Sequence, residues 1–308
     1  MIDIDTFLTI LYVMAEDFCN HHMNTEIRPG PKASLSRGEV ITLAVFGQWG
    51  RFQSERDFYR YAHHNLRSAF PDLPERSQFN RLLRHYRDAI VHFCLYLVEL
   101  MEAQECPYEA LDSTGVVTRD AKRRGRGHLA GLANIGWSNR LGWYEGFHLL
   151  ISVNPVGVIT GFGFSSASTS DQPLAESFFS LRHSADPRVV SVGKPAVGPY
   201  VTDKGFEGKE HHQRWQIYYD AEVICPPQRG SRRVWPKKLR SWLASIRQIV
   251  ETVNDKLHNS FRLNRERPHK LCGFQARLAA KVALHNFCIW LNEQLGRPRL
   301  AFANLLGW

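Results

Sequence analysis

The 308-residue sequence has no long run of uncharged apolar residues, although 44% of its residues are hydrophobic. A membrane-spanning helix needs about 18 or more such residues in succession, so no span is predicted. A secretory signal is missing too, because the N-terminus "MIDIDTFLTILYVMAEDFC" carries Asp3 and Asp5 where a signal carries Lys or Arg. We therefore expect a soluble protein that is neither exported nor bound to a membrane.

Closely spaced cysteines are also lacking. The six cysteines lie far apart and form no C-x-x-C pair. Reduced, mostly buried thiols in a cytosolic protein have this pattern, whereas zinc sites and disulfide frameworks show clustered cysteines. The sequence thus indicates neither zinc nor disulfide bonds.

Acidic residues are scarce in only one part of the chain. Residues 1–105 hold 11 Lys and Arg against 14 Asp and Glu, whereas residues 106–308 hold 28 against 16. Within Arg229–Lys270 there are 12 basic residues and three acidic ones. Such a density suits a polyanion such as nucleic acid. The alternative is a well-solvated helical surface.

The first 105 residues have apolar positions at helical spacing. Ser36, followed by Glu39, predicts a capping box that opens a helix. Further along, a helical face carries Arg81, Arg84, His85 and Asp88. Short helices with tight turns favour a DNA-binding region of helix-turn-helix type, and an ordinary exposed helix surface is the alternative.

After Pro107 the pattern changes to three strands, a helix, a strand, a helix and a strand, with a hairpin turn at 154–157. This order predicts an α/β domain with a mixed sheet over residues 106–308. A long amphipathic helix follows at about 236–259, and the apolar C-terminal helix is expected to pack on the sheet.

Carboxylates occur at unusual places in the predicted sheet. Asp112 lies inside the first strand and Asp203 ends the fourth. An uncompensated buried carboxylate costs several kcal/mol, so such residues usually have a cation, a hydrogen-bond network or a metal beside them. If strands one and four are neighbours, the two aspartates meet at one edge of the sheet.

A third acid, Glu251, lies on the long helix among Ile246, Ile249, Val250 and Val253, which predicts that its side chain faces inward. Three inward carboxylates favour Mg²⁺ or Mn²⁺ over zinc. Paired hard cations catalyse phosphoryl transfer by activating the attacking hydroxyl and stabilising the leaving oxygen.

Each acid has a structural alternative. Asp112 could cap the turn that begins at Ser113, Asp203 could pair with Lys204, and Glu251 could pair with Arg247. Asp171 is interpreted as the N-cap of the helix that begins at Pro173.

The order of strand-Asp, strand-Asp and helix-Glu resembles a bacterial insertion-sequence transposase of the DDE class, with a ribonuclease-H-like catalytic fold. The resemblance rests on "EALDSTGV" at Asp112, the hairpin "GWYEGFHLLISVNPVGVITGFGF", "DKGF" from Asp203, and the R-x-x-x-E spacing of Arg247 and Glu251. A related branch has Tyr and Lys where this chain has Ala244 and His258, which puts a role for that pair in doubt.

The resemblance implies that Asp112, Asp203 and Glu251 hold Mg²⁺ or Mn²⁺ and that Arg247 contacts DNA. Lys204 and Lys256 are further candidates for DNA contacts. Residues 118–143 are predicted to form a flexible, Gly-rich loop. The other candidates are cations of this loop and of the segment before and within the long helix: Lys122, Arg123, Arg124, Arg126, Arg232, Arg233, Lys237, Lys238 and Arg240.

The expected function is cleavage of element ends and their joining to target DNA, with the helical region recognising the terminal inverted repeats. The expected partner is double-stranded DNA, bound by a homodimer in the bacterial cytoplasm, in association with the nucleoid. A metal-dependent nuclease or resolvase of the same fold is one alternative. A domesticated, non-catalytic DNA-binding protein is the other, although such a protein would be expected to have lost one of the acids.

Overall fold

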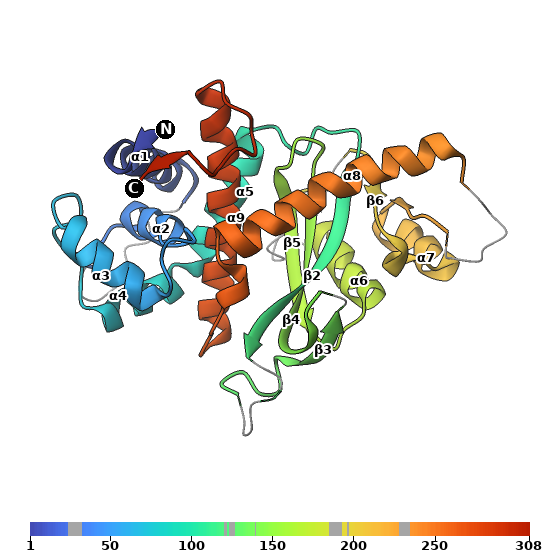
Figure 1. The fold of residues 1–308 in the computed structure, drawn as a ribbon, viewed down its shortest axis with the longest axis horizontal. Coiled ribbons are helices and arrows are strands. Elements are labelled where there is room, and N and C mark those ends of the chain that lie inside the picture. The colour runs from blue at the N-terminus through green and yellow to red at the C-terminus, as the bar shows by residue number, and fades with distance from the viewer. Residues whose placement is uncertain are drawn as a thin grey trace. The chain divides into compact units, whose positions relative to one another are not determined.

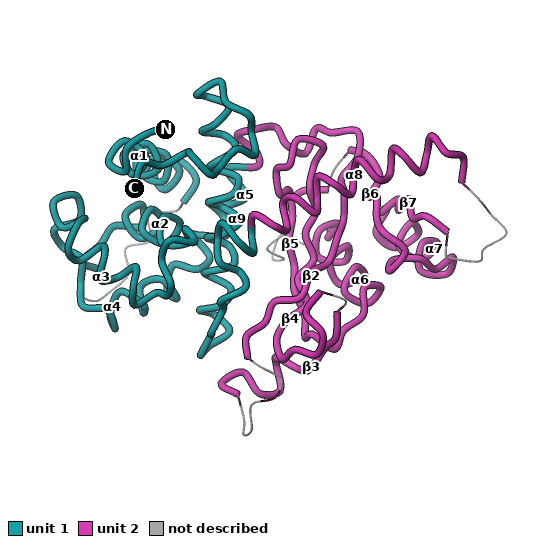
Figure 2. Tube along the Cα trace, viewed as in Figure 1, with its two compact units in different colours: residues 1–97, 257–308 teal, residues 98–256 magenta. Residues whose placement is uncertain are grey.

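The computed structural model describes residues 1–23, 33–119, 122, 127–138, 140–184, 193–195, 197–227 and 235–308. The chain forms two compact units (Figure 2). Unit 1 comprises Met1–Leu97 and Leu257–Trp308, and unit 2 comprises Val98–Lys256. Among the described residues, no helix is both long enough and apolar enough to cross a membrane.

Unit 1 is helical, as the apolar spacing of the N-terminal sequence predicts. Its helices are α1 (Ile4–His22), α2 (Arg37–Phe46), α3 (Glu55–Asn65), α4 (Arg76–His85), α5 (Arg87–Leu100), which runs on into unit 2, and α9 (Leu271–Gln294) (Figure 1). The capping box at the start of α2 is confirmed: the Ser36 hydroxyl accepts from the Glu39 amide, and the Glu39 carboxylate accepts from the Ser36 amide. The chain ends meet in a parallel pair of β1 (Ile2–Asp3) and β8 (Leu306–Gly307).

Two sequence-based expectations about helices are wrong. The face expected to carry Arg84 and Asp88 together does not exist as one helix, because α4 ends at His85 and Asp88 belongs to α5. The C-terminal helix α9 packs on α2 and α4 of unit 1 rather than on the sheet. Its buried residues lie all around the helix, as expected for a central helix enclosed by others.

A buried ionic network joins α9 to the rest of unit 1. The Glu266 carboxylate accepts from Arg277 Nε at 2.8 Å and from Lys281 Nζ at 2.6 Å, and Lys281 Nζ also donates to Gln48 Oε1 at 2.7 Å. Burial alone would raise the pKa of Glu266, but the charges of Arg277 and Lys281 lower it to about 2. The carboxylate is therefore ionised and fully compensated.

The sheet of unit 2 is mixed, as predicted, and is built from β2 (Glu109–Arg119), β3 (Asn134–Ser138), β4 (Gly142–Val153), β5 (Ile159–Ser166), β6 (Tyr200–Val201) and β7 (Val223–Ile224). Strand β4 is antiparallel to β2, β3 and β5, whereas β2, β6 and β7 are parallel. The order β3-β4-β2-β6-β7, with β5 also on β4, makes the Asp112 strand a neighbour of the Asp203 strand. The predicted turn between β4 and β5 is confirmed, with Gly157 at φ 95°.

Helices cover both faces of this sheet (Figure 1). They are α6 (Asp171–Arg182), α7 (Lys209–Tyr219) and α8 (Lys237–Asp255). Leu111 joins a core cluster with Phe178 and Phe179 of α6, whereas the next residue, Asp112, accepts a hydrogen bond from Asn254 of α8. Because successive side chains of a strand point to opposite faces, α6 and α8 lie on opposite sides of β2.

Strand β3 lies in a stretch that we predicted as a flexible Gly-rich loop, and that prediction is wrong for Asn134–Ser138. Its inward position is Gly136, where an added Cβ would lie 2.2 Å from the Ala167 carbonyl oxygen, while Ile135 and Trp137 are exposed. The inward face has no apolar side chain, so the hydrophobic alternation that marks a half-buried strand is missing.

The Glu266 network gives a stability prediction. Glu266→Gln should lower the free energy of unfolding at pH 7 by about 3–5 kcal/mol, since it leaves buried cations uncompensated. Because the carboxylate titrates at a pKa of about 2 instead of 4.5, its stabilisation should be complete above about pH 5 and be lost as the pH falls toward 2. Urea unfolding at several pH values measures both effects.

The matched control is Glu293→Gln on α9, the helix that carries Arg277 and Lys281. Its ion pair with Arg299 is largely exposed, so the change should cost less than about 1 kcal/mol. Equal losses for the two variants would contradict a special role for the buried network.

Candidate active site

Strand pairing brings the two predicted aspartates together. Glu109 and Ala110 of β2 lie opposite Tyr200 and Val201 of β6 in a parallel register. Continuing that register places Asp112 beside Asp203, at the carboxyl end of β6. This is the edge of an α/β sheet where sites form.

The electrostatics of Asp112 reflect this proximity. Burial raises the pKa of its carboxyl group, and the negative charge of Asp203 raises it further, to about 7. A hydrogen bond from the Ser113 backbone and the positive charge of Arg247 oppose that shift. Asp112 therefore lacks full compensation from the residues around it.

Asp203 is held by the turn that follows its strand. Its Oδ1 atom accepts from the Gly205 amide at 2.8 Å and caps the short 3₁₀ helix Lys204–Phe206. An added Cβ at Gly205 would lie 2.3 Å from Asp171 Oδ2 and 3.0 Å from Asp203 Oδ1. The "DKGF" turn therefore needs glycine at its third position.

Glu251 does not face inward as predicted. Its side chain is 62% exposed and forms an ion pair with Arg247, with Arg247 Nη2 3.3 Å from Glu251 Oε1. The buried stripe of α8 contains Ile246, Val250 and Val253, and Glu251 lies at its edge. Glu251 follows Val250, whose side chain is buried. Because neighbouring residues on a helix face different directions, the side chain of Glu251 does not point into the core as well.

Glu251 nevertheless lies on the side of α8 that faces Asp112. Arg247, Glu251 and Asn254 are spaced by four and three residues, so they share one side of the helix. The outer two both act on Asp112: Asn254 Nδ2 donates to Asp112 Oδ2 at 2.9 Å, and the charge of Arg247 lowers its pKa. The sequence analysis did not identify Asn254, whose only local signal is its place three residues after Glu251.

These residues fit a divalent cation in part. Within the described part of the chain, no three His, Cys, Asp or Glu side chains are arranged to hold a metal ion. Asp112 and Asp203 are two oxygen ligands whose mutual repulsion a cation would relieve, and carboxylates suit Mg²⁺ or Mn²⁺. Asn254 Oδ1, beside them, is buried and has no hydrogen-bond partner among the described residues. Such an orphaned acceptor requires an explanation, and a cation supplies one.

Asp171 has a different role from the predicted helix cap. Ser170 is the N-cap of α6, and Asp171 is the first residue of that helix. Its Oδ1 atom accepts from Ser113 Oγ at 2.6 Å and lies 3.5 Å from His148 Nε2. Its Oδ2 atom lies beside Gly205, as Asp203 Oδ1 does, and its negative charge adds to the raised pKa of Asp112, so Asp171 borders the pair of predicted aspartates.

The predicted DNA-contacting cations are only partly within the described residues. Lys204 is exposed beside Asp203, Lys122 is exposed, and Lys256 caps the end of α8 half-buried. Lys237, Lys238 and Arg240 form an exposed group at the start of α8. The remaining candidates lie outside the described residues: Arg123, Arg124, Arg126, Arg232 and Arg233.

A family model described as a transposase DDE domain matches residues 110–287, more than half of the chain. The chain belongs to this family. No curated protein matches it closely enough to be counted as a relative. The family match begins two residues before Asp112 and runs through α8 into α9, and it supports the ribonuclease-H-like assignment of the mixed sheet.

The raised pKa of Asp112 predicts an unusual stability effect in this DDE-family protein. A carboxyl group that titrates near 7 when folded and near 3.8 when unfolded destabilises the fold increasingly as the pH rises from about 4 to about 7, and in full above about 7. Asp112→Asn removes that charge, so it should raise the free energy of unfolding at pH 8, in metal-free buffer, by about 2–4 kcal/mol.

The same substitution should change little at about pH 3, where the carboxyl group is largely protonated in both the folded and the unfolded state. Urea unfolding at the two pH values checks the difference. A loss of stability at pH 8 would show that Asp112 is already compensated.

Proposed function

We propose that the protein is a DNA transposase that cleaves the ends of an insertion element and joins them to target DNA by metal-dependent phosphoryl transfer. The observation that carries the proposal is the pair Asp112 and Asp203 on adjacent parallel strands, under a helix that presents Arg247 and Glu251. Membership of the transposase DDE family agrees with this function.

Asp112, Asp203 and Glu251 would hold Mg²⁺ or Mn²⁺. Two such ions, when bound, would activate the attacking oxygen and stabilise the leaving oxygen. Asn254 positions the Asp112 carboxylate through their hydrogen bond. Glu251 joins the set when its side chain leaves Arg247, and the freed guanidinium then binds a DNA phosphate.

No side-chain nucleophile is needed for this chemistry. Water attacks the phosphodiester in the first step and leaves a 3′ hydroxyl on the element end. That hydroxyl attacks target DNA in the second step, at the same pair of aspartates. A homodimer would hold both ends during the reaction, and the helices of unit 1 would recognise the terminal repeats.

The start of α8 supplies a second contact with the DNA backbone. Lys237 and Glu251 are 14 residues apart, which is about 21 Å along a helix. At about 3.4 Å per nucleotide, a strand gripped by Lys237, Lys238 and Arg240 while its scissile phosphate lies at Asp112 would span about six nucleotides. Lys204 and Lys256 would bind phosphates nearer the reacting one.

The carboxylates give the direct test. Asp112→Asn, Asp203→Asn and Glu251→Gln should each abolish cleavage of a labelled element-end duplex in Mg²⁺, while DNA affinity changes less than about threefold. Since the three side chains act as a unit, double variants should be no worse than single ones. Asp255→Asn, one turn from Glu251, is the matched control and should remain active.

Loss of DNA binding in step with cleavage would show a folding role for these residues instead. Full activity in a chelator would contradict the metal requirement. The products separate transposition from simple nuclease action, because only a transposase joins the cleaved end to a second duplex.

The salt dependence of binding tests the cationic start of α8. Replacing Lys237, Lys238 and Arg240 by Ala should reduce the slope of log affinity against log salt by up to about 3, at about 0.9 per phosphate contact. Preference for element ends over random duplex should persist, because phosphate contacts carry no sequence information. An unchanged slope with lost preference would mean that this segment reads bases.

A further inference from the structure

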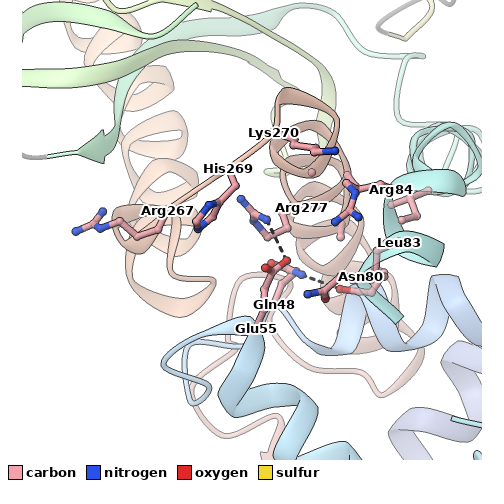
Figure 3. Close-up of a pocket in the computed structure, with 14 residues that line it drawn as sticks. Gln48, Glu55, Asn80, Leu83, Arg84, Arg267, His269, Lys270 and Arg277 are labelled. Atoms are coloured by element: carbon pink, nitrogen blue, oxygen red, sulfur yellow. Dashed lines mark hydrogen bonds and ion pairs between the residues drawn. The ribbon is translucent and has the colours of Figure 1, made fainter. Parts of the chain in front are cut away.

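Unit 1 contains a cavity of about 220 Å³ that is separate from the carboxylates of unit 2. Four cationic side chains and one carboxylate line it: Arg84, Arg267, Lys270, Arg277 and Glu55. Figure 3 shows Arg84, Lys270, Arg277 and Glu55 near one another with Asn80 from α4, whereas the guanidinium of Arg267 extends away from them. The excess of cations marks the cavity as a site for an anion.

Arg277 lies within the cavity wall with spare bonding capacity. Its Nε atom donates to Glu266 and its Nη1 atom to Glu55, at 2.8 and 3.0 Å. Its Nη2 atom is buried and has no hydrogen-bond partner in the described part of the chain. A buried guanidinium nitrogen without an acceptor is unfavourable, so an acceptor from outside the chain would be stabilised here.

Arg84 and Lys270 are two further cations of the cavity lining. Neither forms an ion pair with a carboxylate among the described residues. Lys270 is also the N-cap of α9, makes no capping hydrogen bond there, and is followed by a first turn without an acidic residue. The N-terminus of a helix carries partial positive charge, so a lysine at this position is electrostatically unfavourable unless an anion joins it.

Gly273 opens the first turn of α9 toward the same cations. An added Cβ at this residue would lie 3.7 Å from Arg277 Nη1 and 3.8 Å from Arg84 Cδ. With only a hydrogen there, the backbone amides at the start of α9 can approach a ligand closely. First-turn amides combined with guanidinium groups form the usual binding site for a phosphate group.

We propose that this cavity binds a phosphate group and that the group belongs to the DNA backbone. The assignment of this phosphate group to DNA rests on the proposed function, whereas the binding of a phosphate group rests on the cavity alone. The bound phosphate neutralises Arg84, Lys270 and the start of α9 and accepts from Arg277 Nη2. Unit 1 thereby gains a fixed backbone contact, which positions the DNA without reading its sequence.

Thermal unfolding of the full chain with inorganic phosphate tests the cavity. Phosphate should raise the Tm more than chloride at equal ionic strength, because a ligand that binds only the folded state stabilises it. The variant Arg84→Ala/Lys270→Ala should lose this shift. Arg56→Ala/Arg60→Ala, which removes two exposed charges from α3 outside the cavity, should keep it.

A second variant separates loss of binding from loss of folding. Lys270→Asp places a favourable N-cap at the start of α9, so its Tm without phosphate should be higher than that of the unmodified protein. The same variant should gain nothing from phosphate. An equal phosphate shift in all four proteins, or in none of them, overturns the proposal.

Binding to random-sequence duplex identifies the source of the phosphate. Measured in the Asp112→Asn background, the Arg84→Ala/Lys270→Ala variant should show a salt slope smaller by about 0.9, the value for one phosphate contact. A normal slope together with a lost phosphate shift would mean that the cavity binds free phosphate and not DNA. Strand cleavage by the unmodified protein is assayed separately. A protein that fails to cleave DNA would contradict the proposed function but not the binding of phosphate in the cavity.

Discussion

The repulsion between two carboxylates is the constraint on which the rest of unit 2 depends. Parallel pairing of β2 with β6 fixes the backbone of Asp112 beside that of Asp203. A change of side-chain rotamer therefore cannot move the two residues apart. The surroundings offset only part of this cost, through Asn254, Arg247 and the Gly205 amide. The sheet therefore holds a negative site ready for a cation, and burial of Asp112 together with the charge of Asp203 raises the pKa of Asp112.

Other buried acids in the protein show what full compensation looks like. Glu266 is surrounded by Arg277 and Lys281, and its pKa falls to about 2 although it is buried. Glu109 lies on β2 only three residues before Asp112, and both it and its partner Arg182 have fully buried side chains in an ion pair. The pKa of Glu266 is lowered and that of Asp112 is raised. Ionised Glu266 therefore stabilises the fold, whereas ionised Asp112 destabilises it.

The two units also differ in how the chain builds them. Unit 2 is one continuous segment, whereas unit 1 joins both ends of the chain around α9. The family match crosses this boundary, since it ends inside α9. The central helix of unit 1 thus belongs to the matched region, which also supplies Arg267, Lys270 and Arg277 of the cavity lining, whereas Glu55 and Arg84 lie outside that region.

Local patterns in the sequence determined the elements of the fold and two of the acids. The Ser36–Glu39 capping box, the turn at Gly157 and the strands of Asp112 and Asp203 depend on contacts between near neighbours or on alternation within one strand, which a sequence displays directly. The family resemblance added Glu251 on its helix.

Only the tertiary structure decided which side chains meet. Asn254 reaches Asp112 across 142 positions and Asp171 reaches Ser113 across 58, and no local pattern encodes such pairs. The sequence analysis did not predict that Glu251 is exposed or that Gly136 lies in a strand. Both features depend on the part of the protein that packs against the residue. Periodicity shows that a face is apolar but not what covers it, and for that reason α9 was predicted on the sheet although it forms the centre of unit 1.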